Sequence, residues 1–409
     1  MKRLFIFEPG LREATGHPVQ YAQALEAVGL ERGIPVHVVC HRDADRSILD
    51  SLRLPSPTLR CHCFPIAPAS TTAFAECMRE IMQRFSCTGE DLFLIASAHV
   101  NEIRAVAEIV KDRKSALGWP AIAMNFHQLF PPAPESQEVC RAGYQQFWMD
   151  QLRGAFNAIS ADDSSVSCWT TAAAPLRAAY ETVAARPVGT LPFIFVTGST
   201  PHSSLRDSGS RLRLAFLGDG RQEKGLLPLL EARERLRHVF KDGLTWTLQN
   251  INARGYVASE LVRLTALLEG TRKTPDVELI ERGLLPGEFE QLLDDQQIIL
   301  LPYNPLHYDR RGSLLFVQAV CSGKPVVVSN GTWMAEEVAQ GRAAGVNFEY
   351  LVQNSEATAG NLCEAIREIC ANYAQYSAMA EARSSYYSER HTASAYLDAL
   401  IEHGRKSEV

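Results

Sequence analysis

The sequence lacks any apolar run of about 18 residues, the length that a membrane-spanning helix needs. Its N-terminal stretch MKRLFIFEPG holds only a short apolar run before Glu8 and Pro9, which favours a buried first strand over a signal peptide. The net charge is −6 and the pI is near 6.0, which argues against a strongly basic nucleic-acid-binding surface. We therefore expect a cytoplasmic protein with no nucleic-acid partner.

Cysteine clusters at metal-binding spacing are also missing. The ten cysteines are scattered, and the Cys-His-Cys stretch at residues 61–63 has no second half at zinc-ligand spacing. The Asp-Ala-Asp stretch at residues 43–45 could hold a divalent metal, but it follows only the second expected strand. We interpret the cysteines as reduced, buried thiols and the acidic stretch as a solvated loop. No metal and no cofactor are expected.

Apolar strand-like runs alternate with helical patterns along most of the 409 residues. This length exceeds one ordinary core, and apolar strands separated by helices predict parallel sheets covered on both faces. The alternation weakens between Ala161 and Thr200, where Ala, Ser, Thr and Pro accumulate. We predict two doubly wound domains, at 1–195 and 196–385, joined by a linker near residue 195. A C-terminal helix at about 386–409 is a candidate for completing the first domain.

The pattern predicts individual elements as well. The expected strands are Arg3–Phe7, Val36–Cys40, Asp91–Ser97, Ala121–Phe126, Arg211–Asp219, Leu244–Asn250, Val277–Glu281, Gln297–Tyr303 and Lys324–Ser329. The expected helices cover about 17–32, 101–114, 224–239 and 313–321, and residues 356–403 are expected to be mostly helical. Ligands in such sheets bind beyond the carboxyl ends of the strands, at helix N-termini.

The stretch LGDGRQEKG, residues 217–225, joins an expected strand to an expected helix. Its glycines allow a close approach of backbone to a ligand, and Arg221 and Lys224 stand at the mouth of the helix. Helix-start amides together with a fixed cation suit a phosphate oxygen. A solvated glycine turn with surface charges is the alternative that this motif leaves open.

A second helix start with anion-binding features follows the strand that ends in LLPY. Gly312 and Ser313 open this helix, where Ser313 can cap it and the free amides up to Leu314 can meet a phosphate. The positive end of the helix and the nearby Arg310 and Arg311 favour an anion. Two such helix starts in one half of the chain indicate a diphosphate site more strongly than one.

Together, GDGRQEKG and GSLLFVQAVCSGKPVVVSNGTW resemble the donor domain of GT-B glycosyltransferases, particularly the family 4-like enzymes. In that family a Gly-Arg…Lys-Gly loop holds the donor diphosphate, and two glutamates with seven residues between them precede a Pro-Val-Val strand. The resemblance implies an α/β, GT-B architecture with two Rossmann-like doubly wound domains facing a cleft. It also implies sugar transfer from a nucleotide-diphosphate sugar to an acceptor hydroxyl, with retention and without a metal.

The family's residues carry over onto this sequence with departures. Lys224 falls on the diphosphate lysine, but Asp219 stands at the usual arginine position, so Arg221 is expected to supply that cation. The two glutamates fall on Arg310 and Gln318. The amide of Gln318 can still contact the donor ribose, whereas Arg310 cannot mimic a carboxylate and would instead meet a phosphate or an acidic sugar.

The first half and one later strand end supply further candidates. Gly16 and His17 open a helix where similar enzymes carry a Gly-rich loop under the acceptor and the donor phosphate. His127 lies just past a strand end, where a histidine of similar enzymes faces the transferred sugar and can donate to a hydroxyl or shuttle a proton. His99 is a weaker candidate of this kind, and Gln249 could touch donor or acceptor. Packed or capped histidines and a plain loop glutamine are the alternatives.

The resemblance therefore implies a glycosyltransferase in which His127, Lys224 and Arg221 act at the reacting centre. Its partners would be a nucleotide sugar and a carbohydrate or glycolipid acceptor, as in bacterial polysaccharide or glycoconjugate synthesis. Peripheral contact with the inner membrane face stays open, although no clear basic amphipathic helix supports it. Two other functions also stay open, a sugar-nucleotide epimerase and a non-catalytic GT-B-like partner subunit. Arg310 and Gln318 motivate the partner-subunit reading.

Overall fold

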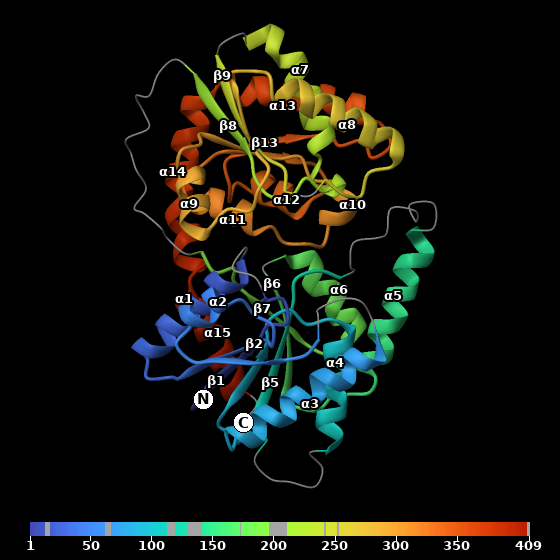
Figure 1. Cartoon of the computed structure of the whole chain (residues 1–409), viewed down its shortest axis with the longest axis vertical. Coiled ribbons are helices and arrows are strands. Elements are labelled where there is room, and N and C mark those ends of the chain that lie inside the picture. The colour runs from blue at the N-terminus through green and yellow to red at the C-terminus, as the bar shows by residue number, and fades with distance from the viewer. Residues whose placement is uncertain are drawn as a thin grey trace. The chain divides into compact units, whose positions relative to one another are not determined.

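The structure is a computed structural model that describes residues 1–12, 17–61, 67–112, 119–129, 141–171, 173–195, 211–240, 243–251 and 253–406. The chain divides into two compact units (Figure 1). The first unit comprises Met1–Pro131, Val139–Val196 and His391–Val409, and the second contains Thr197–Arg390. The chain thus leaves the first unit after Val196 and returns to it at His391.

The first unit is built on a parallel sheet of seven strands in the order β3-β2-β1-β4-β5-β6-β7. Its strands are β1 (Leu4–Phe7), β2 (Val36–His41), β3 (Pro55–Leu59), β4 (Leu92–Ile95), β5 (Ala121–Phe126), β6 (Val166–Thr171) and β7 (Val188–Leu191). The order reverses between β1 and β4, so this pair marks the topological switch point of the sheet. The central strands β1 and β4 are almost wholly apolar and buried, as expected for a parallel sheet covered on both faces.

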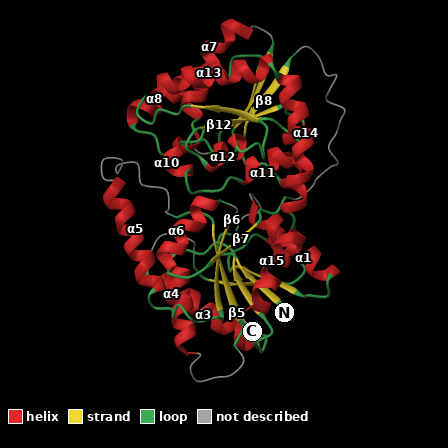
Figure 2. Ribbon diagram, turned by 180° about the vertical axis from the view of Figure 1, so that it is seen from behind, coloured by secondary structure: helices red, strands yellow, loops and turns green. Residues whose placement is uncertain are grey.

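The helices of the first unit cover both faces of its sheet. They are α1 (His17–Glu31), α2 (Arg46–Ser51), α3 (Pro68–Arg84), α4 (Val100–Asp112), α5 (Arg141–Phe156), α6 (Ala174–Ala184) and α15 (Ala393–Lys406). Helices α3, α4 and α5 lie to one side of the strands, and α1 and α15 lie to the other (Figures 1 and 2). In α15, Tyr396 and Leu397 pack in one buried cluster with Leu4 and Ile6 of β1. The C-terminal helix therefore belongs to the core of the first unit.

The second unit repeats this architecture with a parallel sheet of six strands, in the order β10-β9-β8-β11-β12-β13. Its strands are β8 (Leu212–Phe216), β9 (Leu244–Gln249), β10 (Val277–Ile280), β11 (Ile298–Leu301), β12 (Val326–Ser329) and β13 (Gly345–Phe348). Its helices are the 3-10 turn η4 (Gln222–Lys224), α7 (Leu226–Phe240), α8 (Ala258–Thr271), α9 (Pro286–Asp294), α10 (Pro305–Tyr308), α11 (Leu314–Cys321), α12 (Trp333–Ala339), α13 (Ser355–Ala371) and α14 (Tyr373–Arg390). The switch point here lies between β8 and β11. The α/β, doubly wound prediction is confirmed for both halves of the chain.

Several elements of the structure were not among those predicted from the sequence, and two regions show why. Between Ala161 and Thr200, where the pattern weakens, the structure continues the alternation with β6, α6 and β7. Trp169 of β6 packs on Gly189 of β7, where a Cβ would lie 2.3 Å from the indole ring. The absence of a side chain at Gly189 therefore makes room for the tryptophan. The strand β3 was also not predicted, because Pro55 and Pro57 obscure it. Proline is tolerated there since β3 is an edge strand.

Candidate functional site

The loop that carries Lys224 is fastened to three strand ends of the second unit. The backbone amide of Gly218, just past β8, donates a 2.7 Å hydrogen bond to Oε1 of Gln249 at the end of β9. Nε2 of Gln249 donates in turn to the carbonyl of Arg282, just past β10, at 3.1 Å. Gln249 is 2% exposed, and both ends of its amide are engaged inside the protein. The sequence made Gln249 a candidate contact for donor or acceptor. In the structure its amide anchors the loop that carries Lys224.

Gly225 lets this loop pack against the end of β11. It has φ +75°, and a Cβ atom there would lie 1.9 Å from the carbonyl oxygen of Pro302. The amide of Asn304 adds a 2.8 Å hydrogen bond to the carbonyl of Glu223. The helix predicted at about 224–239 is therefore divided, with η4 before Gly225 and α7 after it. Lys224 is the last residue of η4, at the switch point of the sheet.

Lys224 is half-buried, and its ammonium group makes no ion pair or hydrogen bond with any residue that the structure describes. Its Nζ lies 5.9 Å from the centre of the Tyr303 ring, and the side chain of Tyr303 hydrogen-bonds that of Ser313 at the start of α11. Tyr303 therefore links the lysine to the second anion-binding helix start. Burial, with the neighbouring Arg221 as the next cause, lowers the pKa of Lys224 to about 8. A desolvated cation without a counter-ion is suited to receive an anion.

Arg221 and Arg311 lie beside Lys224, and both face carboxylates of the same loop. Nε of Arg221 lies 3.0 Å from Oδ2 of Asp219, and its terminal nitrogen lies 2.8 Å from Oε1 of Glu223. Arg311 approaches the same oxygen of Glu223 at 3.8 Å. Each of these charges influences the pKa of Lys224, so they form one cluster. We call Asp219, Arg221, Glu223, Lys224 and Arg311 the loop cluster.

Arg310, a sequence candidate, lies differently from Arg311. Its side chain is 48% exposed and its Nε lies 3.6 Å from the carboxylate of the adjacent Asp309, whereas the guanidinium of Arg311 stacks 5.1 Å from the ring centre of Tyr308. The sequence pointed to a basic pair but could not say which member faces the lysine. The structure brings Arg311 into the loop cluster.

Helix α11 begins as its sequence predicts. The hydroxyl of Ser313 accepts a 3.3 Å hydrogen bond from the amide of Phe316, which leaves the first amides after Gly312, including that of Leu314, for a ligand. Further along α11, Gln318 is 5% exposed, and its Oε1 has no hydrogen-bond partner among the described residues. A buried carbonyl without a partner costs about 1–3 kcal/mol. It is therefore a place where a ligand hydroxyl would be bound favourably.

His127 lies at the carboxyl end of β5, in the first unit, and is half-buried. Its Nε2 is 2.8 Å from the carbonyl oxygen of Ala96. Because a carbonyl can only accept, Nε2 carries the proton, and in the neutral ring Nδ1 carries the lone pair. Asn125, which is 1% exposed, donates to the same carbonyl at 3.3 Å. The imidazole is thus held in one tautomer, with Nδ1 as its acceptor.

The remaining candidates of the first unit differ in how far the structure describes them. Gly16 lies outside the described residues, and His17 begins α1 without a description of its side chain. His99 is 4% exposed, and its ring meets that of Trp148 at 5.0 Å, edge to face. Burial lowers the pKa of His99 to about 4. His99 is therefore a neutral, packed histidine.

The two metal-like stretches of the sequence give no cluster of ligands in the described part of the chain. Cys61 is buried, and burial raises the pKa of its thiol to about 12, while residues 62 and 63 lie outside the described residues. Asp43 is 61% exposed beside His41. Among the described residues, no group of three or more His, Cys, Asp or Glu side chains could hold a metal ion.

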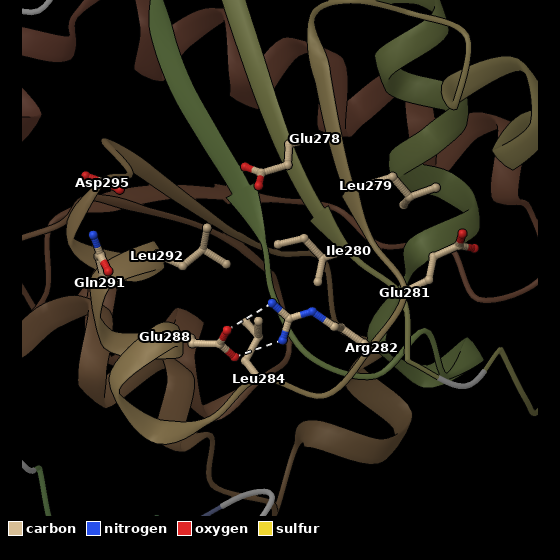
Figure 3. A pocket seen from close by; sticks show the side chains of 10 residues that line it. All are labelled: Glu278, Leu279, Ile280, Glu281, Arg282, Leu284, Glu288, Gln291, Leu292 and Asp295. Carbon is tan, nitrogen blue, oxygen red and sulfur yellow. Dashed lines mark hydrogen bonds and ion pairs between the residues drawn. The ribbon is translucent and has the colours of Figure 1, made fainter.

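A pocket of about 640 Å³ lies between the edge strand β10 and helix α9 in the second unit (Figure 3). Its lining includes four carboxylates, those of Glu278, Glu281, Glu288 and Asp295, and one guanidinium. That guanidinium, of Arg282, is already held by two hydrogen bonds of 2.8 and 3.0 Å to Glu288 (Figure 3). The pocket is therefore acidic and unsuited to phosphate, in contrast to the loop cluster.

Comparison with known proteins supplies the fold family. No protein-family description matches this sequence, and no curated protein matches it by sequence. Among solved structures, sucrose-phosphate synthase from Thermosynechococcus elongatus superposes with a TM-score of 0.65 at 13% identity, over 100% of this chain and 98% of that one. HepE from Anabaena, in complex with UDP and glucose, gives 0.63 at 15% identity over 98% of both chains.

The N-terminal domain of trehalose-6-phosphate phosphatase from Candida albicans is also similar, with a TM-score of 0.66 at 11% identity, over 100% of this chain and 97% of that one. These matches span the whole chain and confirm the GT-B fold that the motifs predicted. The narrower family 4 likeness stays a prediction. None of the helices that the structure describes combines the length and apolar character of a membrane span.

Proposed function

We propose that this protein is a glycosyltransferase that moves a sugar from a nucleotide-diphosphate sugar to an acceptor hydroxyl, with retention and without a metal. The observation that carries the proposal is Lys224. It is a half-buried ammonium without a counter-ion among the described residues, at the switch point of the second sheet. In parallel α/β sheets this position is the usual place of a bound nucleotide.

The chemistry of the loop cluster supports this function. Cleavage of a sugar–phosphate bond leaves negative charge on the departing diphosphate, which fixed cations and dipoles can stabilise. Lys224 and Arg311 would supply the cations, and the free amides at Ser313 and Leu314 would supply the dipole of α11. Arg221 would join them once its own ion pairs loosen.

The remaining contacts follow from unpartnered or fixed groups. The buried carbonyl of Gln318 would accept a hydrogen bond from a ribose hydroxyl of the donor. His127 would contact a sugar hydroxyl, as the histidine of similar enzymes does, with its ring oriented by the hydrogen bond between Nε2 and the carbonyl of Ala96. By the same resemblance, Gly16 and His17 would contact the acceptor and the donor phosphate, and Arg310 would meet a more distant acidic group.

The solved structures support a UDP-sugar as the donor. HepE was solved in complex with UDP and glucose, and a second similar structure is that of a sucrose-phosphate synthase. We therefore place UDP-sugars first among the donors to test. A role in bacterial polysaccharide or glycoconjugate synthesis, with a carbohydrate or glycolipid acceptor in the cytoplasm or at the inner membrane face, is part of this proposal.

Two observations favour a second function, that of a non-catalytic GT-B-like partner subunit. The two family glutamates are replaced by Arg310 and Gln318, and the fold also occurs in the N-terminal domain of a phosphatase. A partner subunit of this kind would bind none of the nucleotides and release none from a nucleotide sugar. Enzyme and partner subunit therefore differ already in nucleotide binding.

The deciding experiment is calorimetry with UDP, GDP and ADP, followed by an assay for nucleoside diphosphate release from the matching sugar nucleotides. We expect one nucleotide to bind, and Lys224→Ala to weaken that binding about tenfold or more. Lys273→Ala, which removes the same charge from an exposed position after α8, should bind as wild type does. Equal binding by Lys224→Ala and wild type would refute the proposed site. No binding by wild type would refute the glycosyltransferase function and favour the partner subunit.

A further inference from the structure

The loop cluster contains a carboxylate where a phosphate oxygen would be expected. Oε1 of Glu223 lies 2.8 Å from a terminal nitrogen of Arg221 and 3.8 Å from one of Arg311. One oxygen atom is thus shared between two guanidinium groups. That arrangement is typical of a bound phosphate, whose oxygens are commonly held by converging arginines.

This carboxylate lies beside the proposed diphosphate site but leaves part of it unpaired. Lys224 follows Glu223 directly in the chain, yet its ammonium lies beyond ion-pair distance of Glu223 and of Asp219. Two guanidinium groups are therefore neutralised by the chain itself, whereas the lysine is not. An incoming anion would meet Lys224 first and would then compete with Glu223 for the arginines.

The backbone of Glu223 is fixed, so only its side chain could give way. Its carbonyl accepts a 2.8 Å hydrogen bond from the amide of Asn304, and Gly225 locks the following turn against Pro302. The side chain is 9% exposed, next to the surface that a ligand would use. Rotation of the carboxylate would release Arg311 and the terminal nitrogen of Arg221 without moving the loop, while Nε of Arg221 would stay paired with Asp219.

We propose that Glu223 is an internal competitor for the donor diphosphate, holding Arg221 and Arg311 until the ligand displaces it. This inference rests on the proposed function, since it assumes that the loop cluster binds a diphosphate. The carboxylate lowers the affinity for the diphosphate product as well as for the donor. Its return to the two arginines would speed the departure of the nucleoside diphosphate after transfer.

If Glu223 instead positions Arg221 for the ligand, neutralising Glu223 should change the ligand affinity in the opposite direction. If the carboxylate only positioned Arg221 for the ligand, its neutralisation would misplace the guanidinium and weaken binding. If it competes, Glu223→Gln keeps the shape of the side chain, removes the competing charge and tightens binding. The direction of the change in affinity therefore separates the two roles.

The test is calorimetry of the full chain with two probes, UDP and inorganic pyrophosphate, at low and high salt. We expect Glu223→Gln to bind both probes about fivefold tighter or better than wild type, with a larger gain at low salt because screening weakens the competing ion pairs. Glu269→Gln removes the same charge from an exposed position of α8 and should bind as wild type does. Glu223→Asp, which shortens the side chain by one methylene and draws the carboxylate back, should also tighten binding, but by less.

Equal or weaker binding of both probes by Glu223→Gln, with Lys224→Ala still impaired, would overturn the competitor role and leave the proposed function standing. Failure of wild type to bind either probe would overturn both. Melting temperatures establish that each variant is folded, and if Glu223→Gln does not fold, Glu223→Asp decides by the same sign.

Discussion

A Cβ atom at Gly218 would lie 2.7 Å from Nζ of Lys224, so the lysine ammonium occupies the space that a side chain at residue 218 would fill. Gly225, seven positions later, faces the backbone carbonyl of Pro302 instead, at 1.9 Å from a Cβ. The two glycines of one loop thus have different neighbours. One borders a flexible side chain that can move, and the other borders backbone that cannot.

This difference predicts separate effects for the two alanine substitutions. Both glycines have positive φ values, +112° and +75°, so both substitutions introduce strain of about 1–2 kcal/mol. Gly225→Ala adds a backbone clash and should lower the free energy of unfolding by about 3 kcal/mol or more. Gly218→Ala should cost less stability but displace Lys224 and weaken UDP binding about tenfold.

Urea unfolding and calorimetry of the two variants check this prediction. Gly270→Ala is a suitable control, because Gly270 lies within α8 with nothing near its missing Cβ. That control should be neutral or slightly stabilising. A larger loss of stability in Gly218→Ala than in Gly225→Ala would contradict the account of the loop.

The pH dependence of nucleotide binding should follow Lys224. Burial lowers the pKa of this lysine to about 8, and a diphosphate needs the ammonium form. Below that pH the lysine is charged and affinity should be constant. Above it the free protein loses the proton, so affinity should fall by up to about tenfold per pH unit.

Calorimetry with UDP between about pH 7 and 9 measures this fall. Lys224→Arg provides the control, because a guanidinium stays charged throughout that range. The variant is expected to bind more weakly than wild type at neutral pH but with a flat profile. A flat profile in wild type would mean that Lys224 does not bind the anion.

Much of the proposed site was readable from the sequence because it is local. A strand followed by glycines and a lysine, and a Gly-Ser pair before an apolar helix, each lie within one short stretch. The structure puts both at the switch point of one sheet. Their joint position also followed from the alternation of strands and helices, since the carboxyl ends of parallel strands meet at one edge.

The parts that sequence did not supply depend on side-chain direction across loops. Arg310 and Arg311 are neighbours in sequence, and only the three-dimensional loop decides that Arg311 reaches Glu223. Tyr303 joins Lys224 to Ser313, although nothing in its own sequence context marks it. Glu223 lies in the same short loop as Lys224, but nothing in the sequence marks it. Irregular segments have no period from which such directions could be predicted.

Gln318 offers a test of the nucleoside half of the site. If its unpartnered carbonyl accepts from a ribose hydroxyl, Gln318→Leu should weaken UDP binding several-fold and leave pyrophosphate binding unchanged. The substitution should not reduce stability, since it removes a buried polar group without a partner. Gln318→Glu, which introduces the carboxylate found in similar enzymes, should bind UDP at least as well as wild type.

Calorimetry with UDP and pyrophosphate distinguishes a ribose contact by Gln318 from an effect of Gln318 on the phosphate site or on the fold. An equal loss for UDP and pyrophosphate in Gln318→Leu would place the residue near the phosphates or in the fold of α11, not at a ribose. Unchanged binding of both probes would remove Gln318 from the site.

The first unit should show its own pH dependence of stability through Glu102. This carboxyl is fully buried at the start of α4, and one of its oxygens accepts a 2.9 Å hydrogen bond from the amide of His99. Burial raises the pKa of Glu102 from 4.5 to about 7, and the nearby Glu8 adds to the rise. The folded state therefore holds this proton more tightly than the unfolded state does.

The sign follows from that difference. Below about pH 4.5 both states carry the proton, and the carboxyl has no effect on stability. As pH rises towards 7, the unfolded state ionises first and stability is lost, up to about 3 kcal/mol above pH 7. Glu102→Gln keeps an accepting carbonyl without the charge, so it should be more stable than wild type at pH 8, with the gap closing towards pH 5. Urea unfolding at pH 5 and pH 8 measures this gap. Glu90→Gln, at an exposed position, should show no such gap. The prediction would be contradicted if the free energy of unfolding of Glu102→Gln differed from that of wild type by the same amount at both pH values.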